Sequence, residues 1–184
     1  MDFLHLAKDL RYSVRKFQDK PVEQEKLDLI LEAGRVAPTA CNYQPQRILV
    51  IEDAAAYEKL KQCTPCHFDA PVVLLICYDK TTVWKNETNG TIGGDVDASI
   101  VTTHMMLQAA ALGLGTTWVG LFDHQKTREL FALPDYLVPV ALLPIGYAAE
   151  DYEANPRHFE RFDLDHSVFS NSFDGLVEGE AHSS

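Results

Sequence analysis

Two segments near the start of the chain, 3–10 and 21–34, carry apolar residues three and four positions apart. That spacing places the apolar side chains on one face of an α-helix. In the second segment Pro21, Glu23 and Glu25 come first, and proline and acidic residues are typical of a helix start. The chain is therefore expected to open with two helices.

Apolar runs rich in β-branched residues follow at 47–52 (RILVIE) and 71–78 (PVVLLICY), each bounded by turn-like segments. Such runs predict buried strands, and a short helix at 54–61 fits between them. Later in the chain, 116–122 and 138–147 predict two more strands, separated by a helix near 125–130. The pattern thus combines strands with interspersed helices.

The segment 97–112 predicts a long central helix, because apolar and small residues recur in it at spacings of three and four. We expect this helix to be buried on most sides. Gly113 and Gly115 follow it directly, as glycines commonly do at helix ends. No period of 20 to 50 residues repeats, and no linker rich in Ser, Gly or Pro divides the chain, so one domain is expected.

Composition narrows the class of protein. The 184 residues are 46% hydrophobic and 23% charged, which is ordinary for a globular domain. The net charge of −11 argues against a nucleic-acid binder, which needs a basic face for the phosphates. The longest apolar run, 70–78, is half the length of a membrane span, and the N-terminus has no apolar signal region. The protein is therefore expected to be cytoplasmic, with its four cysteines as reduced thiols.

The charge is uneven along the chain. The first twenty residues carry five basic and three acidic residues, whereas 151–184 carries two basic and eight acidic ones. The acidic end also contains isolated aromatic residues, namely Phe159, Phe162, Phe169 and Phe173. Two interpretations of this end remain open: a frayed tail, or an extended arm that docks its aromatic side chains on another surface such as a second subunit.

Just after the first expected helix, hydrogen-bond donors occur at every second residue, namely Arg11, Ser13 and Arg15. If this segment is extended, the three side chains point the same way. Guanidinium groups and a hydroxyl in a row suit an oxyanion such as phosphate. The alternative is a pair of surface arginines in ordinary salt bridges.

Two further segments could border a ligand. The loop 37–45 presents Asn42 and Gln44, whose amides both donate and accept, as the edge of a heterocycle requires. The segment 113–120 contains Gly120 within a predicted strand, where a glycine lets a ligand approach the backbone closely. A loop held by its own side chains explains the first segment equally well, and a helix end followed by an ordinary strand explains most of the second.

Cys63, Cys66 and His67 form the sequence pattern of covalent haem attachment. The pattern is short, precedes a buried strand and lacks an export signal, so haem is not expected. A zinc site needs further ligands at suitable spacing, and no metal site is predicted. The role of the two cysteines stays open, as does a thiol-based function.

Five segments, taken in order, resemble the FMN-dependent nitroreductase family. They are RYSVRKF (11–17), EAGRVAPTACNYQP (32–45), RILVIED (47–53), DASIVTTHMMLQAAALGLGTTWVG (97–120) and LLPIGY (142–147). The resemblance extends from about Arg11 to Arg161. It implies an α+β fold with a mostly antiparallel central sheet flanked by helices. It also implies an intertwined homodimer with C-terminal arm exchange, with residues 1–162 as the FMN-binding domain and 163–184 as its arm or tail, partly disordered at the end.

The resemblance also implies the cofactor site. Arg11, Ser13 and Arg15 match a segment that binds the FMN phosphate and the isoalloxazine edge. Arg161 matches a basic residue that reaches the phosphate, but the residues after it depart from the family pattern, which leaves Arg157 as a rival.

Four residues of the loop, Pro38, Thr39, Asn42 and Gln44, match the segment that borders the flavin in the family, with Asn42 as the expected direct contact. Thr39 stands where the family more often has serine, and it keeps the hydroxyl. Val119 and Gly120 match the strand that runs past the flavin, where a backbone N–H approaches N5.

The implied activity is an NAD(P)H-dependent FMN oxidoreductase. NADH or NADPH passes hydride to the flavin and leaves, and a nitroaromatic, a quinone or a similar small acceptor then takes two electrons in a ping-pong mechanism. No catalytic side chain is predicted, because the flavin carries the chemistry and the protein binds and orients it.

Two alternatives remain: a specialised flavin enzyme that destroys flavin or dehalogenates an aromatic, and a non-enzymatic flavin-binding module.

Overall fold

The computed structural model of the chain describes residues 2–174. Contacts between residues divide the chain into two units, with the boundary between Ala154 and Asn155. Each unit is described by itself.

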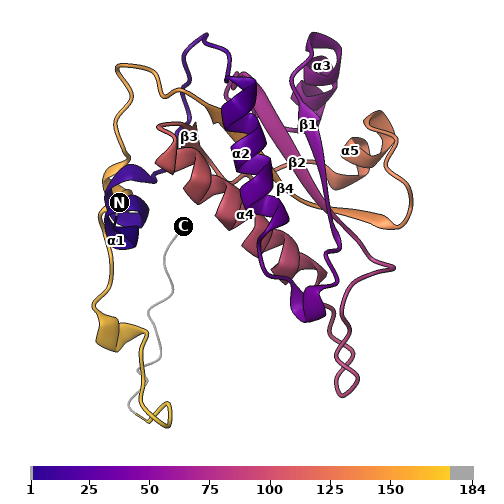
Figure 1. Ribbon diagram of the computed structural model, residues 1–184, viewed down its shortest axis with the longest axis vertical. Helices are drawn as coiled ribbons and strands as arrows, with labels where there is room; N and C mark the ends of the chain where they lie inside the picture. Colours follow the sequence, from indigo (N-terminus) through magenta and orange to yellow (C-terminus); the bar gives the residue numbers. More distant parts are fainter. Residues whose placement is uncertain (1, 175–184) are drawn as a thin grey trace. The chain divides into compact units, whose positions relative to one another are not determined.

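The first unit contains a four-stranded antiparallel sheet (Figure 1). Its strands are β1 (Gln46–Ile51), β2 (Val72–Asp79), β3 (Gly115–Thr116) and β4 (Leu137–Gly146), in the order β1-β2-β4-β3. The helices of this unit are α1 (Phe3–His5), α2 (Gln24–Arg35), α3 (Ala54–Cys63), α4 (Gly94–Ala111) and α5 (His124–Leu130). The predicted α+β class with a central antiparallel sheet is confirmed.

The central strand β2 is buried along its whole length, and successive side chains point to opposite faces of the sheet. Val72, Leu74 and Ile76 pack in one core cluster with residues of α2 and α4. Val73, Leu75 and Cys77 pack in a second cluster with Leu60 of α3 and Phe122. Helices therefore cover both faces of the sheet, which is why this strand reads as a continuous apolar run.

The central helix α4 ends in a Schellman motif. The N–H of Gly113 donates to the carbonyl of Ala110 at 3.0 Å, and the N–H of Leu114 donates to that of Ala109 at 2.9 Å. Gly113 has a φ of +76°, a left-handed conformation that glycine adopts without steric cost. The glycine at this position therefore fixes where the helix stops.

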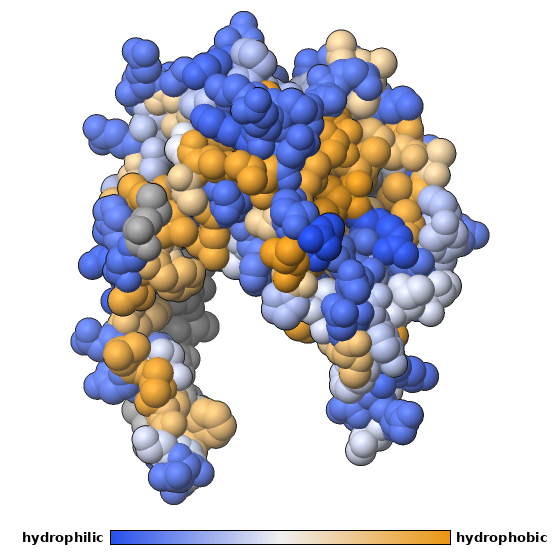
Figure 2. All heavy atoms as spheres, viewed as in Figure 1, coloured by the Kyte–Doolittle hydropathy of each residue, from blue (hydrophilic) through white to orange (hydrophobic). Residues whose placement is uncertain are grey.

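Most of α4 is buried or half-buried, as expected, but one strip of the helix is exposed. Val96 is 61% exposed, and it shares a groove of about 520 Å³ with Ser99, Ile100 and Thr103. The space-filling view shows apolar surface among polar residues in the part of the molecule where α2 and α4 lie (Figure 2). Some apolar residues of α4, such as Val96, are therefore not covered by other parts of the chain.

The predicted strand at 116–122 is shorter than expected. After β3, pairing with β4 stops and resumes as an isolated bridge between Val119 and Leu142. The register places Thr117 opposite Pro144, on the same edge at which Leu142 exchanges hydrogen bonds with Val119. Proline has no N–H to donate, so the ladder is interrupted there.

The first predicted helix is split: α1 is followed by a π-helix, Leu6–Leu10. The chain then runs extended, with Phe17 in an antiparallel bridge to Ala148. Among residues 2–174, no helix is long and apolar enough to cross a membrane.

The second unit, in its described part, contains two short 3₁₀ turns at Pro156–His158 and Leu164–His166. Several large apolar side chains in it are exposed, namely Phe159, Phe162, Leu164, Val168 and Phe173. Apolar surface is visible along this unit in Figure 2. The predicted disorder at the end of the arm concerns residues 175–184, which lie outside the described residues.

Candidate functional site

The segment after the π-helix is extended, as the candidate anion site requires. Ser13 forms a parallel bridge with Thr116, and the N–H of Val14 donates to the Thr116 carbonyl at 2.9 Å. The Val14 side chain is buried at 1% exposure. Because side chains alternate along an extended segment, Arg11, Ser13 and Arg15 lie on the side opposite Val14.

The guanidinium of Arg15 makes no hydrogen bond or ion pair within residues 2–174, and the residue is exposed. The neighbouring Lys16, by contrast, is ion-paired with Asp151. The salt-bridge alternative therefore does not account for Arg15. A free guanidinium two positions from a hydroxyl on the same side can bind an oxyanion through charge-assisted hydrogen bonds.

The loop between α2 and β1 has an unusual backbone. Cys41, Asn42 and Gln44 have φ values of 51°, 55° and 50°, in the left-handed region that residues other than glycine rarely enter. The N–H of Gln44 donates to Oγ1 of Thr39 at 3.0 Å, and the N–H of Asn42 donates to the Thr39 carbonyl at 2.9 Å. The Thr39 hydroxyl thus serves the loop itself, while Pro38 and the two amide side chains are exposed.

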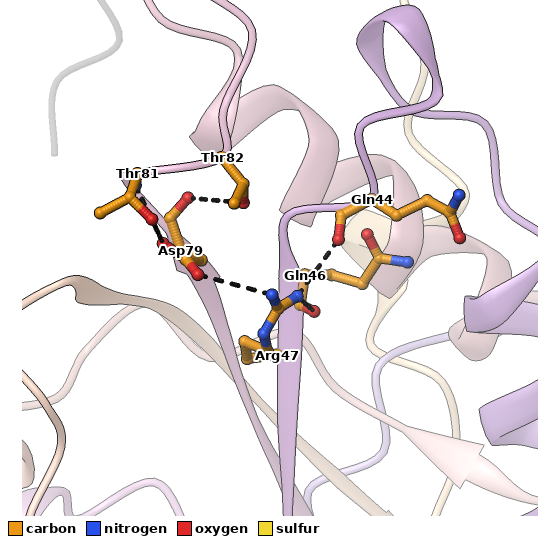
Figure 3. Close-up of polar contacts among 6 residues, drawn as sticks. All are labelled: Gln44, Gln46, Arg47, Asp79, Thr81 and Thr82. Carbon is orange, nitrogen blue, oxygen red and sulfur yellow. Dashed lines mark hydrogen bonds and ion pairs between the residues drawn. The ribbon is translucent and has the colours of Figure 1, made fainter.

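Arg47 of β1 ties the end of this loop to the end of β2 (Figure 3). Its Nη1 donates to the carbonyls of Gln44 at 3.2 Å and Gln46 at 2.8 Å, and its Nη2 lies 3.4 Å from Oδ2 of Asp79. Asp79 also accepts from the N–H of Thr81 at 2.9 Å and from its hydroxyl. The hydrogen bonds from Thr81, and then the Arg47 charge, lower the pKa of Asp79.

The backbone at Val119 is fixed while the space beside Gly120 is open. Val119 exchanges two backbone hydrogen bonds with Leu142, at 2.9 and 3.0 Å. A Cβ atom placed on Gly120 would meet nothing within 4 Å, and this residue is exposed. Packing within the chain therefore does not require glycine here, and a ligand can approach the backbone.

The chain just beyond Gly120 is held by the cysteine-containing segment. The hydroxyl of Thr64, a residue 2% exposed, donates to the Leu121 carbonyl at 2.6 Å and accepts from the Cys66 N–H at 3.0 Å. The Cys63 carbonyl accepts from the N–H of Asp123 at 2.8 Å. The segment 63–67 (CTPCH) therefore has a structural role, because it holds the backbone of Leu121 and Asp123 in place.

The four cysteines are free thiols that differ in burial. Cys63 and Cys77 are buried, and burial raises the pKa of Cys77 to about 11. Cys41 is exposed and Cys66 is half-buried. Within the described residues, no group of three or more His, Cys, Asp or Glu side chains could hold a metal ion.

The structure places the predicted site residues at opposite ends of α4. Ala40 of the loop contacts Asp97 in the first turn of this helix, whereas Ser13 and Val14 pair with Thr116, beyond its last turn. The helix has 18 residues and spans about 27 Å. A single chain therefore does not bring the basic segment and the amide-bearing loop to one small ligand (Figure 1).

The sequence model of the Nitroreductase family matches residues 10–67 and 65–147. These matches cover well over half of the chain. The chain belongs to the nitroreductase family.

Three similar proteins illustrate the membership. An FMN reductase (NAD(P)H) of Bacillus subtilis strain 168 is 34% identical over 163 residues, covering 79% of this chain and 66% of that protein. The crystal structure of a nitroreductase family protein from Clostridium difficile 630 is 43% identical with a TM-score of 0.88, covering 94% and 99% of the two chains. A nitroreductase-like protein from Desulfovibrio desulfuricans, solved in complex with FMN, is 29% identical with a TM-score of 0.76, covering 94% and 99%. The predicted family and its oxidoreductase character are confirmed.

Sequence reasoning missed three polar residues that support the candidate loop: Arg47, Asp79 and Asp97. Asp97 is 2% exposed, and apart from Thr102 the other buried residues of its helix are apolar or glycine. An acidic residue at a core position of an apolar helix was the available signal. Arg47 and Asp79 give no comparable signal, because single charged residues at strand ends are common.

The two C-terminal arginines, Arg157 and Arg161, are both exposed. Nη1 of Arg161 donates to the carbonyls of Glu160 at 2.6 Å and Arg157 at 3.3 Å, all within the second unit. Which of the two arginines serves a phosphate stays a prediction.

Proposed function

We propose that the protein is an FMN-dependent oxidoreductase that uses NADH or NADPH to reduce nitroaromatics, quinones or similar small acceptors. The observation that carries this proposal is the unpaired Arg15 guanidinium on the same side of an extended segment as Ser13, in a chain of the nitroreductase family. Two similar proteins support FMN and NAD(P)H as cofactors: one is named an NAD(P)H FMN reductase, and the other was solved in complex with FMN.

The residues present fit FMN in three respects. Arg15 and Ser13 offer donors for the phosphate, and Arg11 lies on their side of the segment. Asn42 and Gln44 expose amides, which match the alternating donors and acceptors along a flavin edge. The open space beside Gly120 leaves its backbone accessible to a flat ring.

In this proposal FMN, when bound, supplies the two-electron redox chemistry, with donor and acceptor visiting the site in turn. The chain contributes binding and orientation. Arg11, Ser13 and Arg15 hold the phosphate, and the guanidinium charges stabilise negative charge near them. Pro38, Thr39, Asn42 and Gln44 border the ring from the loop, and Val119 and Gly120 line it with backbone.

We propose further that the site is built by two copies of the chain. The basic segment and the loop lie about 27 Å apart along α4, which is longer than a mononucleotide. The exposed strip of α4 between them carries apolar residues, including Ile100 and the 61% exposed Val96, among polar ones. A second copy packed on this strip would bring the loop of one protomer to the basic segment of the other.

The C-terminal part supports the same assembly. Its exposed side chains, including Phe159, Phe162 and Phe173, suit an arm that docks on a partner copy. We propose that this arm crosses to the partner and carries Arg161 or Arg157 to the phosphate. The protein is proposed to act in the cytoplasm, without nucleic acid or membrane as partner.

Mixed dimers test cofactor and assembly together. Arg15→Ala and Asn42→Ala protomers, carrying different affinity tags, are co-expressed, and the mixed dimers are isolated. If each site takes Arg15 from one copy and Asn42 from the other, a mixed dimer has one intact site and one doubly altered site. It should then bind one FMN per dimer with the wild-type affinity, whereas each parental variant binds weakly.

Two results would contradict the proposal. A mixed dimer without any tight site would show that each site is built from one chain. Wild-type protein that is colourless, and whose melting temperature does not change with added FMN, would overturn the flavin function itself.

A further inference from the structure

The buried carboxyl group of Asp97 holds the start of the amide-bearing loop. Its Oδ1 accepts the N–H of Ala40 at 2.9 Å, across 57 positions of sequence, and Asp97 is 2% exposed. The other oxygen, Oδ2, is buried and has no hydrogen-bond partner within the described residues. A carboxyl in this setting is costly to bury, so its retention in the core indicates a specific task.

The loop that it holds is one that needs external support. Cys41, Asn42 and Gln44 all have positive φ values near 50°, a conformation that is unfavourable for residues other than glycine and that persists only where the surrounding structure holds it. The Ala40 peptide is the point where the loop begins, because the N–H of Tyr43 donates back to the Ala40 carbonyl at 3.1 Å. A bond to Ala40 therefore fixes the orientation of the whole turn.

The other supports of the loop lie at its far end or within it, and at that end the carbonyl of the buried Pro45 accepts the N–H of Asp79 at 2.8 Å. Arg47 reaches the Gln44 carbonyl at the far end, but its side chain is 47% exposed. The internal hydrogen bonds from Asn42 and Gln44 to Thr39 join parts of the loop to each other and not to the core. The Asp97 bond is thus the buried connection between this loop and the central helix.

We infer that Asp97 is a positioning residue for the flavin: it acts through the Ala40 N–H to hold Asn42 and Gln44 in the conformation that receives the ring. This inference rests on the proposed function, and it names a residue that does not itself touch the cofactor. The hydrogen bond carries the effect, so an acceptor at Oδ1 is the essential chemical feature.

Three variants in α4 test the inference. Asp97→Ala removes the acceptor. Asp97→Asn keeps an amide oxygen that can accept the Ala40 N–H. Thr102→Val is the matched control, because Thr102 is fully buried in the same helix and its hydroxyl donates only to the Ala98 carbonyl at 2.7 Å. FMN affinity of the apoprotein and amide hydrogen exchange at Ala40 are measured for each.

We expect Asp97→Ala to weaken FMN binding about tenfold or more and to abolish the exchange protection of Ala40. Asp97→Asn should stay within about threefold of wild type, and Thr102→Val should lower the melting temperature without changing FMN affinity. Unchanged FMN affinity in Asp97→Ala, with Ala40 unprotected, would overturn the inference. Equal loss in Asp97→Asn, with Ala40 still protected, would overturn it as well.

Should Asp97→Ala fail to fold, Ala40→Pro removes the donor from the loop side without altering α4. Thr39 has φ −131° and ψ 158°, the extended conformation that precedes proline. Ala40→Pro should then weaken FMN binding to a similar extent, and full affinity in this variant would overturn the inference. Wild-type protein that binds no FMN would instead contradict the proposed function, which keeps the two failures distinct.

Discussion

The hydroxyl of Tyr152 donates a hydrogen bond to the backbone carbonyl of Ser13 at 2.8 Å. The ring of Tyr152 also stacks on that of Tyr12, with centroids 6.3 Å apart and planes 10° from parallel. Tyr152 thereby holds the extended segment at two successive residues, Tyr12 and Ser13, and leaves the Arg15 guanidinium free. The candidate anion site is thus held by backbone contacts and not by pairing of its own charges.

Tyr152→Phe tests this support. The ring and its stacking on Tyr12 remain, but the Ser13 carbonyl loses its donor. We expect the free energy of unfolding to fall by about 1 kcal/mol, the usual contribution of one hydrogen bond. Chemical denaturation measures the change, and an unaltered denaturation midpoint would show that the bond does not stabilise the segment.

Arg15→Ala should weaken FMN binding by about 1.5–3 kcal/mol, the range for hydrogen bonds to charged groups. Quenching of flavin fluorescence on titration with apoprotein gives the affinity. The matched control is Arg35→Ala, because Arg35 is an exposed arginine already paired with Glu32 at 2.6 Å. Equal affinities for the two variants would rule out a phosphate role for Arg15.

Val96→Glu should disrupt the proposed dimer without harming the single chain. Val96 lies in the first turn of α4, where an acidic residue is favourable for the helix dipole, but on the exposed apolar strip. Sedimentation or light scattering should show a shift toward monomer. Ala55→Glu, at an exposed position of α3, should leave the mass unchanged. A dimeric Val96→Glu variant would place the interface elsewhere.

How much of this molecule is readable from sequence depends on what each residue contacts. The apolar run of β2 and the helical spacing in α4 predict their elements, because both patterns reflect burial within the chain. The strand at 116–122 was overestimated, since Pro144 lies far away in sequence and its pairing with Thr117 depends on the register of β4. Local propensity contains no information on that register.

In the candidate site, too, local features can be predicted from sequence and long-range contacts cannot. Arg15 and Gly120 were found from local sequence, and the structure gives both a suitable setting. Asp97 was missed as a support for Ala40, because a contact across 57 positions leaves no periodic signal. The separation of the two groups of site residues along α4 was likewise not predictable, since it depends on which end of the helix each loop joins.

Asp79 gives the protein a pH-dependent contribution to stability. The pKa of its carboxyl is lowered in the folded state, mainly by Thr81, so the folded state binds fewer protons than the unfolded one in the acid range. The stabilisation is therefore present at neutral pH and is lost as pH falls below about 4. Thermal denaturation should show Asp79→Asn less stable than wild type at pH 7, with the difference shrinking toward pH 3.

Thr81→Val provides the companion measurement, because it removes the bonding hydroxyl while keeping the backbone N–H of residue 81. Its difference from wild type should shrink over the same pH range. A stability difference for Asp79→Asn that stays constant from pH 7 to pH 3 would contradict the assignment to this carboxyl.

Thr64→Val should lower the free energy of unfolding by about 1–3 kcal/mol, because the change is nearly isosteric and leaves the Leu121 carbonyl without its buried donor. Thr64→Ser keeps the hydroxyl and should recover most of this loss. Equal stability of the valine and serine variants, measured by denaturant titration, would show that the hydroxyl does not hold the chain beyond Gly120.

The length of α4 also affects how the cofactor would be retained. With the anion-binding segment at one end of the helix and the ring-binding loop at the other, each flavin would be shared by two polypeptides. Dilution would then release flavin even at constant excess ligand, because subunit dissociation separates the two halves of every site. Flavin content would in that case report on protein concentration as well as on flavin supply.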